Sequence, residues 1–456
     1  MKKIIIFLLK NKMKKNIIII LLASVPSLIV ITLSHYNFPL FIEGSKSSYD
    51  WAFVNAAKQI LETGNYSGLH NFPLYPYVVA FIFKVFGSNT LYPIIMNAFF
   101  HGLTAFLLAN ISKKFNSSWF YPTLIITSLW PHLLWRTTYL YAETFFTLMI
   151  VTSLFFLFIY FEKKKIYYLF LSSVFLGLSV ITKSANIFVL FILPLFLFFL
   201  FYKKIKKNIF HSFKLVLIYV LTFTFIFSFQ VLRVYKETGY IGYSYSSGFV
   251  LSDFVYPCLQ TKFGCGKKDR PAMYKSLRAV NKEMIDVKYP DSINPYYESL
   301  VKKKIAIKLI KEIDLNQIFI ATFGGYVKLF MHNFTYDVFR RLEIKSIHLT
   351  DFTGNLYTKM NSMLKQIIYE DRLMLFWLFS QIVLIFSRAI QVIGLYNLLF
   401  SKKNIYEFLL LSIFFVPILF SIIAMGTIRY RIPLEPFLII LTISGLFYII
   451  KKFRKT

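Results

Sequence analysis

The sequence is poor in charged residues, and in acidic residues above all. Only 16% of its 456 residues are charged, and 21 acidic residues stand against 52 basic ones. Apolar residues make up 57% of the chain and aromatic residues 20%. A soluble chain of this length cannot hide so much apolar surface in its cores. This composition excludes a soluble globular protein and predicts a membrane protein.

Several motifs of soluble enzymes are missing from the sequence. It has no glycine-rich phosphate loop, no serine nucleophile elbow and no zinc-ligand spacing, which argues against a nucleotide-sugar donor bound in a Rossmann-like domain. It has no internal repeat either, which argues against transporters built from inverted repeats. His101 and His132 belong to no metal-ligand spacing, so we expect them to pack between helices.

Cysteine is scarce as well. Cys258 and Cys265 are the only two and lie close together in the sequence. An oxidising compartment permits a disulfide that closes a small turn, and a structural role is the one we expect.

Long apolar runs are plentiful, and about 20 residues are needed to cross a bilayer. Two of the runs, Trp119–Leu134 and Ile166–Ile181, are short for a span. The sequence predicts ten spans, at Ile17–Ser34, Asn89–Ile111, Trp119–Leu134, Tyr141–Phe161, Ile166–Ile181, Ala185–Tyr202, Phe210–Val231, Leu373–Phe400, Ile405–Met425 and Leu434–Ile450.

Basic residues orient these spans, because Lys and Arg collect on short cytoplasmic connections. Every second short connection is basic, and both ends of the chain are basic too. This pattern predicts that the N- and C-termini are cytoplasmic and that the protein resides in the inner or plasma membrane. The inner basic segments contain Lys2 to Lys15, Lys113 and Lys114, Lys163 to Lys165, Lys203 to Lys207, Lys402 and Lys403, and Lys451 to Lys455.

The net charge of +31 does not indicate nucleic-acid binding. Much of the excess is lysine that flanks spans, and the inner loops are too short to build a basic face for DNA or RNA. We therefore expect no nucleic-acid partner.

Two long stretches remain outside the membrane, and the topology places both on the outer, periplasmic or extracellular, side. The spans hold almost no carboxylates, whereas acidic residues gather in or beside these outer stretches. A channel or carrier usually keeps its polar residues at mid-membrane depth, so a site at the outer surface is expected. The sequence therefore predicts five parts: a cytoplasmic N-terminus at 1–16, a membrane core at 17–233 with its outer loop at 35–88, a mostly helical outer region at 234–372, C-terminal spans at 373–450 and a cytoplasmic tail at 451–456. Within the outer region, 318–331 is apolar enough to lie in the membrane interface.

The first outer stretch holds the sharpest local pattern. Residues 49–61 read as an amphipathic helix that Gly64 ends, and 73–87 read as a short helix in the membrane interface. Asp50 lies at or near the start of the first helix, where the helix dipole favours a carboxylate. From the residues alone, Asp50 reads as an N-cap of a surface helix.

Four motifs follow one another along the chain. They are Asp50, Phe53 and Ala57 followed by Pro73, Tyr75, Pro76 and Gly87; then Tyr141-Ala142-Glu143; then Gly177 to Lys183; and then Arg429-Tyr430-Arg431-Ile432-Pro433. In this order they resemble the GT-C glycosyltransferases, in particular the family 39 protein-mannosyltransferase-like and aminoarabinose-transferase-like membrane enzymes. Phe53 stands where a Tyr is commoner in these enzymes, and Lys183 stands where an Arg is commoner. The resemblance covers about residues 17–205 and 425–450 and implies a GT-C-like fold, an all-α membrane protein of about ten transmembrane helices with two outer-face regions.

The resemblance implies transfer of a sugar from a polyprenyl-phosphate-linked donor to an acceptor hydroxyl, with inversion. Asp50 would then be the general base, and Glu143 would orient the acceptor, share the base role or hold a divalent cation. No cofactor follows with certainty, and no metal site can be assigned. Without the resemblance, Glu143 reads as a carboxylate at a span end, paired with Arg136.

Arginine is distributed unevenly. Of 11 arginines, nine lie on the predicted outer face. On the predicted inner face, the positive charge comes mainly from lysine. Topology needs charge alone, but bidentate recognition of phosphate favours arginine. Arg429 and Arg431 are the first candidates for lipid-phosphate binding, with Lys183 and Arg233 after them. For the arginines at 270, 278, 340 and 341 we expect salt bridges within the outer region instead.

Two other functions stay open at this point. A lipid flippase or solute transporter explains the spans but not the outer regions. An O-antigen ligase or polymerase also uses polyprenyl-linked donors, and His332 or His348 would serve it. The partners expected are a polyprenyl-phosphate sugar, membrane lipid, and a glycan, lipid or protein acceptor. The sequence does not identify the sugar.

Overall fold

The computed structural model describes most of the chain as helix. The described residues contain no strand, which confirms the predicted all-α class. They are 12–37, 48–66, 72–204, 208–244, 246–260, 278, 282, 295–335, 338, 358, 372–400, 405–420 and 428–454.

Among these residues, six helices are long and apolar enough to cross a membrane. Because their apolar windows contain at most two charged residues, water is an unsuitable solvent for their exposed faces. The prediction of a polytopic integral membrane protein is thereby confirmed. The six helices are α2 (Lys12–Asn37), α5 (Leu91–Phe115), α8 (Ala142–Lys163), α11 (Ile209–Thr238), α19 (Arg372–Phe400) and α21 (Glu435–Phe453).

Three further predicted spans form shorter apolar helices: α9 (Ile166–Thr182), α10 (Ile187–Lys204) and α20 (Ile405–Phe420). The predicted end of the last one, Met425, lies outside the described residues.

The predicted span Trp119–Leu134 is not one continuous helix. The stretch forms a 3-10 turn (Ser117–Trp119), α6 (Phe120–Ser128) and α7 (Pro131–Arg136), with extended backbone at Trp130. Pro131 has no backbone N–H, so it cannot continue a helix but readily starts one. The break turns α7 and its side chains away from the line of α6.

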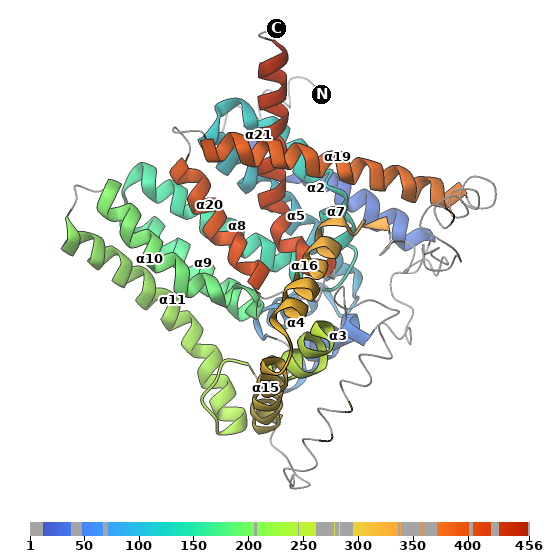
Figure 1. Ribbon diagram of the computed structural model, residues 1–456, viewed down its shortest axis with the longest axis vertical. Helices are drawn as coiled ribbons and strands as arrows, with labels where there is room; N and C mark the ends of the chain where they lie inside the picture. Colours follow the sequence, from blue (N-terminus) through green and yellow to red (C-terminus); the bar gives the residue numbers. More distant parts are fainter. Residues whose placement is uncertain are drawn as a thin grey trace.

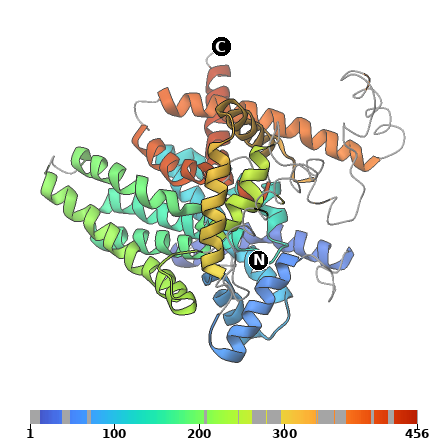
Figure 2. The ribbon, with the colours of Figure 1, turned by 60° about the horizontal axis from the view of Figure 1, so that its bottom comes forward.

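The helices α8, α9, α10 and α11 lie side by side, and α5 packs between α2 and α8 (Figures 1 and 2). The main core runs through this bundle and on into α20 and α21. The C-terminal end of α21 lies at one end of the molecule, and α3 (Ser48–Thr63), α4 (Leu74–Phe86) and α15 (Pro295–Lys311) lie toward the other (Figure 1).

Both helices predicted in the first outer stretch are present. Gly64 ends α3 with a φ of +73°, a left-handed conformation that favours glycine. Pro73 caps α4 and Gly87 follows it. Asp50 is the third residue of α3, and its side chain lies outside the described residues.

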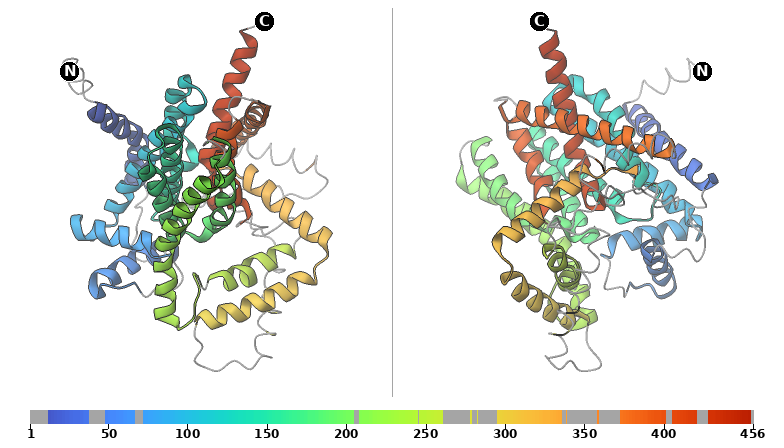
Figure 3. Two further views of the ribbon diagram at one scale, coloured as in Figure 1. Left: turned by 90° about the vertical axis from the view of Figure 1, so that its left-hand side faces the viewer. Right: turned by 45° about the vertical axis from the view of Figure 1, so that its right-hand side comes forward.

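The described part of the second region that was predicted to lie on the outer side forms a small core of its own. It consists of α12 (Ser246–Val250), a π-helical turn (Leu251–Val255), α13 (Tyr256–Leu259), α15 and α16 (Leu315–Met331). Figure 3 shows α15 and α16, in yellow and orange, at one edge of the molecule. Cys258 in α13 is disulfide-bonded, and Cys265, the only other cysteine of the chain, lies outside the described residues.

Candidate active site

Two of the predicted site residues form a buried ion pair. The Nζ of Lys183 lies 2.9 Å from the Oε1 of Glu143, and the Glu143 side chain has no exposed surface. The Lys183 side chain keeps 16% of its surface exposed. The pair therefore reaches the surface on its lysine side only.

The ends of two antiparallel helices hold this pair. Glu143 is in the first turn of α8, where the helix dipole stabilises a negative charge, and Lys183 directly follows α9, where it stabilises a positive one. Because α8 and α9 pack along their length, the start of one helix meets the end of the other. The short turn between them puts Glu143 and Lys183 at the same end of the pair of helices.

Aromatic rings tie the Asp50 helix to the same end of α8. Phe53 meets Tyr75 edge to face with 5.1 Å between ring centroids, and Tyr75 lies 6.1 Å from the ring of Phe145. Tyr75 is buried and donates to Asn97 Oδ1 over 3.4 Å, which fixes α4 on α5. Phe53 follows Asp50 by one helical turn, and Phe145 follows Glu143 by two residues, so the two acidic motifs belong to one packed unit.

Arg233, near the C-terminal end of α11, contacts Tyr66, which lies just after α3. Its NH1 donates to the Tyr66 carbonyl over 3.4 Å, and its guanidinium lies 5.2 Å from the Tyr66 ring centroid. Its NH1 also lies 3.4 Å from Glu237 Oε1. Arg233 thus lies at the same end of the molecule as α3, although the structure shows it engaged with protein groups.

Arg136 is buried and lies over two tyrosine rings. Its guanidinium lies 5.1 Å from the ring centroid of Tyr139 and 5.3 Å from that of Tyr141. These two rings stack on each other with 5.3 Å between their centroids. The expected pairing of Arg136 with Glu143 stays a prediction, and Lys183 lies at ion-pair distance from Glu143.

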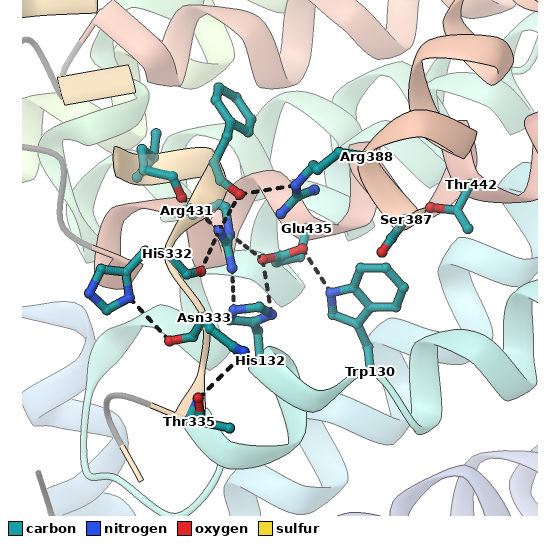
Figure 4. A network of polar contacts seen from close by, with 12 residues as sticks. Trp130, His132, His332, Asn333, Thr335, Ser387, Arg388, Arg431, Glu435 and Thr442 are labelled. Carbon is teal, nitrogen blue, oxygen red and sulfur yellow. Dashed lines mark hydrogen bonds and ion pairs between the residues drawn. The ribbon is translucent and has the colours of Figure 1, made fainter. Parts of the chain in front are cut away.

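Arg431 is fully buried and lies in a second polar network (Figure 4). Its Nε donates to Glu435 Oε1 over 2.7 Å, and its NH1 donates to the carbonyls of Leu329, Phe330 and His332 over 2.6, 3.0 and 2.9 Å. Its NH2 contacts His132 Nε2. All three guanidinium nitrogens contact protein groups, so Arg431 positions chain segments in this structure. Its predicted contact with a lipid phosphate would require these contacts to be given up, and it stays a prediction.

Glu435 completes this network. It has no exposed surface, and its Oε2 accepts from Trp130 Nε1 over 2.7 Å. Because an arginine only donates, His132 Nε2 is an acceptor and the ring proton is on Nδ1, which lies 3.6 Å from Glu435 Oε1. Arg429 belongs to the 3-10 stretch Ile428–Leu434, and its side chain lies outside the described residues.

Sequence reasoning missed Glu435 and Arg388 and gave His132 only a packing role. Glu435 follows Arg431 by four residues, a spacing typical of ion pairs on one helical face. Arg388 is a lone arginine within an apolar helix, and such a residue signals a specific partner. Both signals were present in the sequence, but their partners, Trp130, His132 and Phe330, are far away in the chain.

The described residues contain no group of three His, Cys, Asp or Glu side chains placed to hold a metal ion. Glu143 lies next to a lysine in this structure.

Comparison with known proteins gives one family match. Residues 70–230 match the model of the dolichyl-phosphate-mannose-protein mannosyltransferase family. The predicted resemblance is confirmed. The matched residues include Glu143 and Lys183, whereas Asp50, Arg233, Arg429 and Arg431 lie outside the match. Over residues 70–230, the chain is similar to membrane glycosyltransferases of the GT-C type.

Solved structures give a weaker likeness. The chain is similar to ArnT from Cupriavidus metallidurans in the apo state, with 10% identity and a TM-score of 0.35. It is similar to the same protein bound to undecaprenyl phosphate, with 12% identity and a TM-score of 0.35. Each match covers 93% of this chain and 76% of that one. No curated protein matches the sequence.

Proposed function

We propose that this protein transfers a sugar from a polyprenyl-phosphate-linked donor to an acceptor hydroxyl at the outer face of the membrane. The family that matches residues 70–230 is named for a donor of this class, a mannose on dolichyl phosphate. The proposal specifies the chemical class of the donor only. The sugar itself is left open, and so is the acceptor, which is a glycan, a lipid or a protein.

The observation that supports this function best is the Glu143–Lys183 pair, to whose helix α8 the Asp50 helix is connected by ring contacts. Three motifs from separate parts of the sequence meet at one end of the bundle, through the pair at 2.9 Å and through the ring contacts from Phe53 to Phe145. This arrangement combines a buried carboxylate with a partly exposed cation close to the helix that carries Asp50. Transfer from a lipid phosphate needs a cation beside the phosphate and a carboxylate as base.

Departure of the lipid phosphate requires fixed positive charge beside it. Lys183 has the exposed surface for this, and Arg233 lies at the outer end of α11. Arg429 and Arg431 were the first candidates for this role. Because Arg431 is fully buried, we assign the direct phosphate contact to Lys183 and Arg233, with Arg429 as an additional candidate.

Attack by the acceptor hydroxyl requires a base, and we assign this role to Asp50. Direct displacement on the donor then inverts the anomeric configuration. Glu143 supports the site by holding Lys183, and it is the residue that would meet a divalent cation if the reaction uses one.

The test is mass spectrometry of polyprenyl-phosphate lipids from cells with the wild type, a deletion, Asp50→Asn or Glu62→Gln. Glu62 is an exposed carboxylate on the same helix, so it is the matched control. Loss of a general base lowers the rate by about 10²- to 10⁴-fold. We therefore expect one polyprenyl-phosphate sugar to accumulate in the deletion and in Asp50→Asn, but not in Glu62→Gln.

Other outcomes identify the alternatives. A flippase or a ligase keeps working with Asn at position 50, so unchanged lipids in Asp50→Asn would contradict the proposal. Accumulation of a diphosphate-linked donor in the deletion alone would indicate the ligase. If the protein is a ligase, His332 becomes a candidate site residue. His348, the other candidate, lies outside the described residues.

A further inference from the structure

The helix α16 presents an apolar stripe that nothing in the described part of the protein covers. Five apolar residues at four-residue spacing have between 45% and 80% of their surface exposed. The opposite side is buried and partly made of small residues, Ala321, Gly324 and Gly325. An exposed apolar stripe along a whole helix marks contact with a membrane or another protein. The stripe consists of Leu315, Phe319, Phe323, Val327 and Met331.

The two ends of α16 lie in different cores. Near its start, Ala321 belongs to the small outer core, and Gln317 donates to the Leu259 carbonyl over 3.0 Å. Near its end, Leu329 belongs to the main core among the membrane helices, and Tyr326 donates to the Leu419 carbonyl of α20 over 3.0 Å. The helix therefore runs from the outer region into the membrane bundle and stops there.

A helix that ends inside a bundle leaves its last carbonyls without water to bond to. Two arginines meet them here. Arg431 donates to the carbonyls of Leu329, Phe330 and His332, and Arg388 Nε donates to the Phe330 carbonyl over 3.0 Å. The carbonyl end of a helix carries partial negative charge, so it also favours two cations.

This end of α16 accounts for a charge imbalance in the network. Among the described residues of Figure 4, Arg431 and Arg388 face one carboxylate, Glu435, because His132 accepts from Arg431 and is neutral. The helix end and its carbonyls provide the additional negative partner. Arg388 NH1 is held in turn by Gln391 Oε1 over 2.6 Å.

We propose that α16 is a re-entrant membrane helix: its Leu315–Met331 stripe faces lipid hydrocarbon, and Arg431 and Arg388 cap its end inside the bundle. The occupant of the stripe is lipid rather than water, because the same helix enters the core formed by the membrane helices. It is lipid rather than a protein partner, because α11 and α19 present exposed apolar residues of the same kind, including Phe225 and Phe386. Arg431 and Arg388 are positioning residues under this proposal.

Spin labelling tests the lipid contact. Phe319→Cys, Phe323→Cys and Val327→Cys are labelled in nanodiscs, with Phe225→Cys on α11 as the lipid control and Lys308→Cys on α15 as the water control. Both control positions are exposed. We expect the stripe to be more accessible to oxygen than to a water-soluble nickel chelate, as at Phe225 and opposite to Lys308.

Two outcomes would overturn the lipid contact. Higher accessibility to the nickel chelate along the stripe would place α16 in water. Low accessibility to both reagents would mean that a protein covers the stripe.

A second measurement tests the cap. Arg388→Gln removes one donor to the Phe330 carbonyl and leaves Arg431 in place. We expect the label at Val327 to become more mobile and the label at Phe319 to stay unchanged, because only the capped end is released. Equal mobility changes at both positions, or none at Val327, would contradict a capping role.

Discussion

A buried ion pair such as Glu143–Lys183 needs a physical reason, because desolvation of two charges often cancels their attraction. Here the two helix ends contribute. The start of α8 stabilises the carboxylate, and the end of α9 stabilises the ammonium. The two helix ends thus offset part of the desolvation cost of the pair.

A double substitution separates the role of the pair in stability from its role in the transfer reaction. Glu143→Gln or Lys183→Met alone leaves one charge without its closest partner, and loss of one member of a buried pair costs about 3–5 kcal/mol. Glu143→Gln with Lys183→Met removes both charges, so we expect it to recover most of the thermal stability in detergent. Transferase activity, followed as donor accumulation, should stay lost.

Recovery of activity together with stability would contradict a functional role for the pair. The more exposed ion pair of Lys114 and Glu162 at the other end of α8 provides the control, since its neutralisation should change neither quantity much.

Single residues of the site were predictable, but their partners were not. Glu143 and Lys183 each follow from a motif. Their contact depends on the antiparallel packing of α8 and α9 across 40 positions of sequence. The Arg431 network depends on contacts that cross between 99 and 305 positions, as with Arg431 to His332 and Trp130 to Glu435. No local pattern encodes such distances.

At the scale of elements, apolar length decides where helices form, whereas backbone chemistry decides where they end and how they cross. Nine of the ten predicted spans correspond to a single helix, because hydrophobic length is read directly from sequence. The tenth is broken at Pro131 for the reason given above. Crossings are harder to predict, since they depend on small residues that face each other.

The crossing of α19 and α21 rests on two glycines. A Cβ added at Gly394 would lie 1.9 Å from the Leu441 carbonyl oxygen, and one added at Gly445 would lie 2.1 Å from that of Ile390. Both obstacles are backbone atoms, so the helices must separate to admit any side chain. Nearby, Gln391 donates to Thr442 and Asn397 to Ser444, each over 3.0 Å.

We therefore expect Gly394→Leu to weaken this crossing strongly. Overpacking costs about 1–3 kcal/mol even where side chains can move, and here backbone must move. The measurement is thermal unfolding in detergent, with Ala389→Leu as the control, because Ala389 is exposed on the same helix. Equal melting temperatures for the two variants would show that the crossing is looser than described.

At the scale of the whole molecule, the candidate site and a basic connection lie at opposite ends of α8. Lys114 and Glu162 form an ion pair at 2.5 Å where α5 and α8 end, and Glu143 and Lys183 lie at the opposite end of α8. The basic connections thus lie away from the candidate site. The loop charges alone predict an inner side at the Lys114–Glu162 end of α8 and an outer side at the Glu143–Lys183 end.

Cysteine labelling checks the polarity as a whole. Lys58→Cys on α3 and Lys308→Cys on α15 are exposed positions of the proposed outer face, and Lys165→Cys and Lys452→Cys are exposed positions of the proposed inner one. A membrane-impermeant maleimide added to intact cells should label the first two. The last two should react only after permeabilisation.

Cys258 is disulfide-bonded, so it adds no background without reductant. If Lys58 and Lys165 were labelled from the same side, the loop charges would have oriented the chain wrongly. The donor phosphate would then have to be sought on the cytoplasmic surface.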